Sequence, residues 1–241
     1  MNKLCYSISV LLTSSCIYGI ANAEDFYLRA DLGVAQSNRV SSNGEFFYKD
    51  SNEKKFSNGI VYSVGVGYKL KYNLRTELAY NRSNLKYSAN IDNSGAYKAY
   101  KAYKAYKQKL QINALMANII YDIQLPSNYR FNPYLGIGLG YAQLKPGEAS
   151  LSSNNNVVNF KANNSNNFTY AISGGVAFPL NEQIMLDIGY KFQDFGKVKN
   201  ISSIKVSNFP RYRDYKKVKP GFKVRTHNIM AGIRYTWSSW G

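Results

Sequence analysis

The chain has 241 residues, a formal net charge of +17 and a mean hydropathy of −0.37. This length fits one domain or two small ones, and a hydropathy scan would not identify a membrane protein. This result does not exclude a membrane β-barrel. Lipid-facing and lumen-facing residues alternate along the strands of a barrel, so their hydropathies cancel in any averaging window. The 22 tyrosines and 12 phenylalanines are typical of membrane–water interfaces and of protein-binding surfaces.

Residues 1–23 predict a secretory signal peptide. A lysine follows the start, Leu4–Ile20 is apolar with small residues, and Ala21-Asn22-Ala23 offers a small-x-small cleavage site. Cleavage there would remove Cys5 and Cys16, the only cysteines, so the exported chain would have no disulfide. A transmembrane anchor and a lipoprotein signal ending at Cys16 are the alternatives. Serines within the apolar stretch weaken the first, and Thr13 in place of leucine weakens the second.

Eight segments then alternate large apolar residues with small or polar ones at every second position, which is the period of a β-strand. In chain order they are Phe26–Ala35, Ile60–Leu70, Leu74–Asn81, Lys109–Ile123, Asn132–Ala142, Phe168–Phe178, Ile184–Gln193 and Asn228–Trp237. Most are close to the roughly ten residues that a tilted strand needs to cross a bilayer. We expect the large apolar set to face lipid and the other set to face the inside of a barrel.

The fourth and fifth segments differ in the clarity of this pattern. The fifth alternates four large residues with three glycines: Leu135, Ile137, Leu139 and Tyr141 against Gly136, Gly138 and Gly140. An almost bare second face suits the cramped inside of a small closed barrel. In the fourth segment, Leu110, Ile112 and Ala114 begin on the apolar side, but the phase blurs through Leu115–Asn118 and leaves the facing of this strand open.

The connections between these segments alternate in length. Those after the first, third, fifth and seventh are long, polar and rich in Asn, Ser or Lys, whereas three are short: Lys71-Tyr72-Asn73, Gln124–Arg130 and Pro179–Gln183. Bacterial outer-membrane barrels have this layout, with periplasmic turns and termini and with extracellular loops. The sequence therefore predicts an all-β fold over residues 24–241: an eight-stranded antiparallel transmembrane β-barrel of the outer-membrane type with four long extracellular loops.

The predicted inward faces carry charges of both signs: Arg29, Asp31, Arg75, Glu77, Asp187, Lys191 and Arg234. The interior of an eight-stranded barrel is only wide enough to be filled by side chains. Because a lone buried charge is costly, we expect these residues to pair and to form a polar core that blocks the lumen. A water-filled pore is the alternative, and the small number of strands argues against it.

Three motifs resemble the opacity-like family of eight-stranded outer-membrane barrels, and within it the surface adhesins of rickettsiae. They are Asn132-Pro133-Tyr134 with the glycines that follow, Asn118-Ile119-Ile120-Tyr121-Asp122, and Gly232-Ile233-Arg234-Tyr235. With the signal sequence, the likeness covers essentially the whole mature chain, and its motifs are signatures of fold and assembly rather than of an active site. The resemblance implies attachment to host surface or serum proteins, vitronectin among them.

A triplet, Ala-Tyr-Lys, repeats four times between Ala96 and Lys107. Its tyrosines and lysines are Tyr97, Lys98, Tyr100, Lys101, Tyr103, Lys104, Tyr106 and Lys107. A three-residue period matches neither a strand face nor a helix face, so we expect a mobile or short helical loop tip. As a contact surface it would offer amphipathic tyrosine area and lysine charge. The alternative is a replication-slippage repeat that a loop tip tolerates.

The last long connection, Gly196–Pro220, is the most basic part of the chain. Its cations are Lys197, Lys199, Lys205, Arg211, Arg213, Lys216, Lys217 and Lys219, against Asp214 alone. A run like this is usually a solvated surface, and outside a bacterium it would attract sulfated glycans, acidic host proteins and lipopolysaccharide phosphates. The export signal argues against nucleic acid as a partner. Leu151–Asn167, rich in Asn and Ser, predicts a flexible polar spacer.

An enzyme would need a positioned base with a nucleophile, or paired carboxylates. The only histidine, His227, is expected on the outward face beside Arg225, and no Ser-His-Asp spacing surrounds it. No Cys or His cluster predicts a metal site, and the glycines lie inside strands rather than in a phosphate-binding loop. We therefore predict no catalytic, cofactor or metal site.

The resemblance implies an adhesin whose loops bind host surface, serum or matrix proteins, and the patterns add a monomeric barrel as its anchor in outer-membrane lipid. The candidate partner-binding residues are the tyrosines and lysines of the repeat together with Lys197, Lys199, Arg211, Arg213, Lys216, Lys217 and Lys219. The alternatives are a structural barrel without a dedicated ligand, and a small pore or a lipid-active enzyme.

Overall fold

A computed structural model describes most of the chain after the predicted signal peptide. The described residues are 25–37, 56–90, 105–126, 128–147, 149–152, 157–198, 201–206 and 222–237. The predicted signal peptide lies outside these ranges. Within the ranges, no helix has the length and apolar character needed to cross a membrane.

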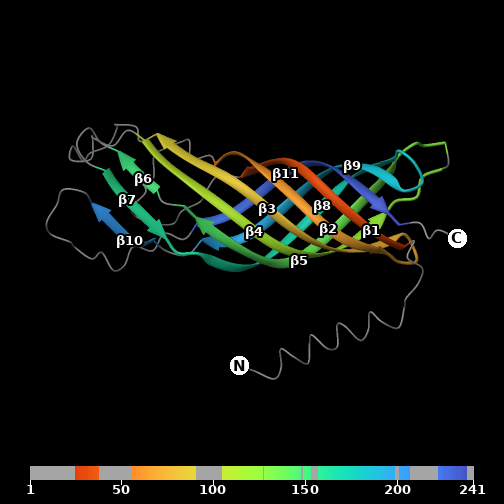
Figure 1. Cartoon of the computed structure of the whole chain (residues 1–241), viewed down its shortest axis with the longest axis horizontal. Coiled ribbons are helices and arrows are strands. Elements are labelled where there is room, and N and C mark those ends of the chain that lie inside the picture. Colours follow the sequence, from red (N-terminus) through yellow and green to blue (C-terminus); the bar gives the residue numbers. More distant parts are fainter. Residues whose placement is uncertain are drawn as a thin grey trace, which may run out of the picture.

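Eight long strands form a closed antiparallel barrel (Figure 1). They are β1 (Phe26–Ser37), β2 (Phe56–Lys69), β3 (Leu74–Asn90), β4 (Ala105–Asp122), β5 (Asn132–Pro146), β8 (Ser165–Pro179), β9 (Ile184–Val198) and β11 (Phe222–Thr236). Each of these strands pairs with the next long strand along the chain, and β11 pairs with β1 to close the ring. This closed ring of eight antiparallel strands confirms the predicted fold class. Closure leaves the barrel wall without a free strand edge.

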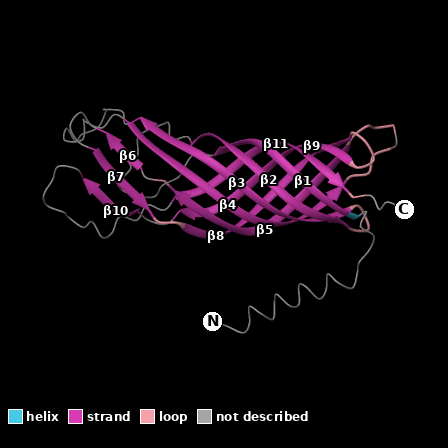
Figure 2. Ribbon diagram, viewed as in Figure 1, coloured by secondary structure: helices cyan, strands magenta, loops and turns pink. Residues whose placement is uncertain are grey.

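Short connections gather at one end of the barrel, as predicted (Figure 2). They span residues 70–73, 123–131 and 180–183, and the start of β1 lies beside the end of β11 at the same end, where the Trp237 amide donates to the Phe26 carbonyl over 3.2 Å. In the turn between β2 and β3, Tyr72 and Asn73 both have a positive φ, 62° and 61°, the left-handed region that many tight turns use. This end is the periplasmic one, and the long connections are extracellular.

The strands run further toward the extracellular side than the sequence pattern predicted. β3 continues to Asn90 rather than ending at Asn81, and β4 begins at Ala105 rather than Lys109. Three short strands extend the sheet there, in the order β10-β7-β6-β4: β6 (Ala149–Ser152), β7 (Val157–Ala162) and β10 (Ile201–Val206). Figure 1 draws them beyond the extracellular end of the barrel.

The prediction of an unstructured spacer over Leu151–Asn167 is therefore wrong. This segment contains the end of β6, all of β7 and the start of β8. Backbone pairing explains the difference: β5 leaves β4 at the pair Leu110 and Pro146, and β6 takes over the same edge of β4 from Lys107 upward. An unpaired edge would leave the amide and carbonyl groups of β4 without partners, and β6 satisfies them.

The outer faces of the strands carry a wide apolar belt. Many large side chains on these faces are at least half exposed, among them Leu32, Ile60, Leu139, Ile172 and Ile229. In water such a belt would be far larger than the apolar patches that monomeric proteins expose, whereas in a bilayer it contacts hydrocarbon. The prediction that the large apolar set faces lipid is confirmed for these strands.

The interior consists of two layers of side chains. Charged residues fill the periplasmic half, as predicted, together with Tyr27 and Tyr134. The extracellular half combines apolar residues with buried uncharged polar ones, among them Asn81, Thr169, Gln193, Thr226 and Asn228. Its apolar members, which we call the apolar layer, are Ala35, Val61, Leu85, Leu110, Ile112, Ala114, Met116, Ala142, Leu144, Ala171, Phe195, Val198, Val224 and Met230. Leu110, Ile112 and Ala114 therefore face the lumen, and β4 turns Leu115 and Ile119 toward lipid. The predicted polar core of inward charges lies in the periplasmic half, and the apolar layer above it was not predicted.

Candidate functional site at the extracellular end and in the lumen

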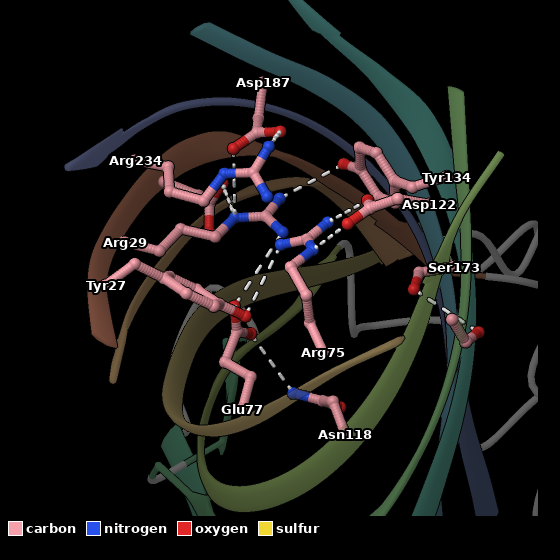
Figure 3. Close-up of polar contacts among 12 residues, drawn as sticks. Tyr27, Arg29, Arg75, Glu77, Asn118, Asp122, Tyr134, Ser173, Asp187 and Arg234 are labelled. Atoms are coloured by element: carbon pink, nitrogen blue, oxygen red, sulfur yellow. Dashed lines mark hydrogen bonds and ion pairs between the residues drawn. The ribbon is translucent and has the colours of Figure 1, made fainter. Parts of the chain in front are cut away.

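The charged layer of the lumen surrounds the guanidinium of Arg29, with Asp187 of β9 on one side of it (Figure 3). Arg234 of β11 approaches Asp187 Oδ1 with its Nη2 at 3.3 Å, and Arg29 of β1 lies with its Nε 3.9 Å from Asp187 Oδ2. The same Nε is 2.9 Å from Asp31 Oδ1. The two-residue strand period turns all four side chains inward, so charges from three strands meet at the barrel axis.

A second group of polar contacts continues this layer across the lumen. Arg75 of β3 donates from Nε and Nη2 to the two oxygens of Asp122, over 2.7 and 2.8 Å, in the bidentate geometry that makes strong ion pairs. The carboxylate of Glu77 accepts the Tyr27 hydroxyl at 3.2 Å and the Asn118 amide at 3.3 Å. The predicted pairing of inward charges is thus confirmed for this layer.

Two inward tyrosines pack against the arginines. The guanidinium of Arg75 lies 5.4 Å from the ring centre of Tyr27 and 5.6 Å from that of Tyr134, within the range of cation–π contacts. Inward glycines make room for these rings: a Cβ on Gly67 would collide with the Tyr27 ring, and a Cβ on Gly175 would lie 2.6 Å from the Tyr134 hydroxyl. The tyrosine rings therefore occupy space that is free because these inward positions are glycines without a side chain.

Sequence reasoning assigned no site role to two members of this layer, Asp122 and Tyr134. Tyr134 was not counted in the alternating pattern, but it stands two residues before Gly136 and therefore lies on the same inward face of the strand. Asp122 stands two residues after the inward Ile120. The strand period alone could have found Tyr134, but not Asp122, because the sequence left the facing of β4 open. Lys191 lies on the inner side of β9 between Gly189 and Gln193, as predicted.

Nothing in the geometry of this layer resembles a catalytic arrangement. The ion pairs lie in the periplasmic half of the lumen, and the apolar layer separates them from the extracellular side. Among the described residues, no three His, Cys, Asp or Glu side chains gather as metal ligands. His227 faces outward, as predicted, where its Nδ1 meets the Tyr190 hydroxyl and its ring packs near Phe192.

Most of the predicted partner-binding residues lie outside the described part of the chain. These are Tyr97, Lys98, Tyr100, Lys101, Tyr103, Lys104, Lys199, Arg211, Arg213, Lys216, Lys217 and Lys219. Lys197 is exposed near the end of β9, in register with Lys223 of β11. The prediction of a loop tip is wrong for Tyr106 and Lys107, which belong to β4 and pair with Leu151 and Ser150 of β6.

The extended sheet joins three of the extracellular connections at their bases. β3 and β4 flank the second connection, β6 and β7 belong to the third, and β10 belongs to the fourth. Because these strands are neighbours in one sheet, in the order β10-β7-β6-β4-β3, the segments carrying the Tyr-Lys repeat and the basic run start from one hydrogen-bonded platform. Sequence reasoning missed this platform, since its pairings join residues far apart in the chain.

Comparison with known proteins places the chain in a family. The family model described as "Opacity family porin protein" matches residues 86–213. "Putative adhesin" of Rickettsia bellii is 24% identical over 235 residues, which cover 94% of each chain. "Putative adhesin RC1281" of Rickettsia conorii is 27% identical over 216 residues, covering 87% of this chain and 81% of the relative.

Among solved structures, the outer membrane protein OprG of Pseudomonas aeruginosa superposes with a TM-score of 0.53 at 14% identity, covering 90% of this chain and 99% of OprG. This likeness concerns the fold, and the fold is the one that the strand pairing establishes. The family match spans more than half of the chain, including the extended sheet. The chain therefore belongs to the opacity family of porin proteins, as an eight-stranded barrel of the bacterial outer membrane.

Proposed function

We propose that this barrel is an adhesin that binds host-cell, serum or matrix proteins through its extracellular end. The observation that carries the proposal is the platform of β3, β4, β6, β7 and β10, which stands above the barrel and holds three extracellular connections together. A sheet at their bases lowers the entropy cost of ordering these segments on a partner. Two relatives that cover most of this chain carry the name of adhesins, which supports the same conclusion.

The binding residues in this proposal are the tyrosines and lysines of the second connection and the cations of the fourth. Tyrosine supplies large, rigid contact area, and lysine and arginine attract acidic partners at long range. Tyr106 and Lys107 contribute differently from the rest of the repeat, because they are part of β4 and support the platform.

The proposal is tested by measuring binding of the purified barrel to immobilised serum and matrix proteins, vitronectin among them. One variant replaces residues 96–104 by a Gly/Ser segment of equal length, so that β4 still begins at Ala105. A second carries glutamine at Lys199, Arg211, Arg213, Lys216, Lys217 and Lys219. Each variant should weaken binding by about tenfold or more, and the second should also lose most of the salt dependence of binding.

The matched control carries glutamine at exposed cations of the periplasmic turns, Lys71 and Arg130. It should bind as the parent does, because these residues lie at the opposite end of the barrel. Equal binding by the parent and by both loop variants would contradict the adhesin proposal and favour a structural barrel without a dedicated ligand.

A further inference from the structure

Strands β3, β4 and β5 carry a group of cations on their outer faces, just above the apolar belt. We define the cationic patch as Arg82, Lys86, Lys109 and Lys145 together with the amide side chains between them, Asn84, Gln111, Asn113 and Gln143. All eight share the outward side of their strands with Tyr80, Leu115 and Tyr141, which form the uppermost row of the belt. A molecule that contacts the patch therefore stands over the lipid beside the barrel, and not over its axis.

The strand register sorts the patch into rows. Arg82, Asn113 and Gln143 form the first row above the belt. Asn84, Gln111 and Lys145 form the second, and Lys86 faces Lys109 directly in the third. One row is two residues, which on a strand tilted by about 45° corresponds to about 5 Å of height. Along each strand, the members of the three rows therefore lie roughly 5, 10 and 15 Å above the last apolar residue of that same strand.

The side chains of the patch offer hydrogen-bond donors to an anion. Asn113 Oδ1 already accepts the Tyr80 hydroxyl at 3.0 Å and the Gln111 amide at 3.4 Å, which leaves the Nδ2 group of Asn113 as its donor. No carboxylate within the described residues pairs with the four cations of the patch. Lys86 and Lys109 stand directly opposite each other, an arrangement of like charges that is unfavourable unless an anion lies between them.

The opposite side of the barrel rim is built differently. There Lys223 Nζ and Arg225 Nε each lie 2.9 Å from the same carboxylate oxygen of Asp194, so two cations of β11 already have an anionic partner. Lys197 of β9 lies beside Lys223, so this side carries three cations and one carboxylate, whereas the four cations over β3–β5 have no carboxylate partner among the described residues. This asymmetry favours a ligand that binds one side of the barrel over a uniform layer of counterions.

We propose that the cationic patch binds a phosphorylated glycolipid of the outer leaflet. Continuity with the lipid-facing belt favours a lipid, and the donors favour phosphate. Height selects the headgroup: a phospholipid headgroup layer is roughly 5–8 Å thick and would reach the first two rows at most, whereas phosphorylated sugars extend to Lys86 and Lys109. The ligand class is therefore an acylated saccharide that carries phosphate, with its acyl chains against Leu115, Leu139 and Tyr141.

The experiment measures binding of diphosphorylated lipid A and its dephosphorylated form to the folded barrel in detergent micelles, by native mass spectrometry and by the shift in thermal unfolding midpoint. The test variant carries Lys86→Gln, Lys109→Gln and Lys145→Gln; the control carries Lys71→Gln, Arg130→Gln and Lys197→Gln, which remove equal charge from exposed positions elsewhere. The test variant should bind between about ten- and a hundredfold more weakly, and the control within about threefold of the parent. The dephosphorylated lipid should bind weakly to all three proteins.

The direction in which Lys109→Gln changes the thermal unfolding midpoint distinguishes a ligand site from a structural role. Without glycolipid, Lys109→Gln should leave the unfolding midpoint unchanged or raise it, since it removes repulsion with Lys86; with glycolipid, it should reduce the stabilisation seen for the parent. A lower midpoint in both conditions would overturn the proposal, as would equal protection by inorganic phosphate.

Retained lipid binding by the test variant, with loss of binding to a host protein, would assign the patch to a protein partner and also overturn the proposal. The loop variants described under the proposed function should bind the glycolipid as the parent does, so this site and the adhesin proposal succeed or fail separately.

Discussion

Asp187 occupies a position in the lumen where its carboxylate lies near two cations, one of which, Arg29, also contacts Asp31. Its side chain has 0% exposure, and Arg29 and Arg234 both approach it from neighbouring inward positions. A buried charge without a partner is far more costly than the pair is favourable, because water cannot replace the lost contact. Removing the charge at this residue should therefore leave two guanidinium groups less well compensated inside the barrel.

The substitution Asp187→Asn keeps the size of the side chain and removes its charge. We expect the free energy of unfolding to fall by about 3 kcal/mol, measured by urea unfolding of the barrel in lipid vesicles. Glu182→Gln is the control, since Glu182 is exposed in the turn before β9 and its change should be within about 0.5 kcal/mol. Equal effects of the two substitutions would mean that the network contributes nothing specific to stability.

Individual strands show both the reach and the limit of the periodicity argument. In β5 the pattern was unambiguous, and the structure has Leu135, Ile137 and Leu139 outside with the glycines inside. In β4 apolar residues occupy both faces, so periodicity could not tell Leu110, Ile112 and Ala114 from lipid-facing residues. The rule that large apolar residues face lipid fails wherever the lumen itself is apolar, and only the partner strands decide the facing.

A matched pair of leucines in β5 tests these two environments. Leu144 is 0% exposed within the apolar layer, whereas Leu139 is 57% exposed on the outer face. Leu144→Ala should leave a cavity and lower the free energy of unfolding by about 2–4 kcal/mol. Leu139→Ala should cost about 1 kcal/mol or less, because lipid or detergent fills the space it vacates.

Urea unfolding in vesicles would measure both leucine variants under the same conditions, and a gel that separates folded from heat-unfolded barrel would verify that each one folds. A larger loss at Leu139 than at Leu144 would mean that the extracellular half of the lumen is not packed as a core.

At the scale of the whole molecule, the eight long strands, their alternating connections and the inward charges could all be predicted from the sequence, because each rests on residues one to a few positions apart. The platform could not. Its pairings join Lys107 to Ser150 and Phe160 to Ile204. The local sequence of an Asn- and Ser-rich segment does not indicate which distant strand it pairs with. The cationic patch depended on the same long-range register, since its rows exist only once β3, β4 and β5 are aligned.

The same global arrangement determines whether the barrel conducts ions. Its lumen is closed twice, by the charged layer around Arg29 and by the apolar layer around Ile112 and Leu144. An ion would have to displace guanidinium groups and rings in the first layer and lose its hydration shell in the second. The wild-type barrel should therefore show no stepwise conductance in a planar bilayer. The gel that separates folded from heat-unfolded barrel is the control that the protein in this experiment is folded.

Opening one layer should not be enough. Ile112→Ser with Leu144→Ser makes the apolar layer more polar and leaves the charged layer in place. Tyr27→Ser with Tyr134→Ser removes side-chain volume from the charged layer and leaves the apolar layer unchanged. Each pair should remain non-conducting, and only the combination of all four should produce steady current, because the two barriers act in series. If either pair conducted as well as the combination, the other layer would be no barrier at all, and the barrel would have a single gate.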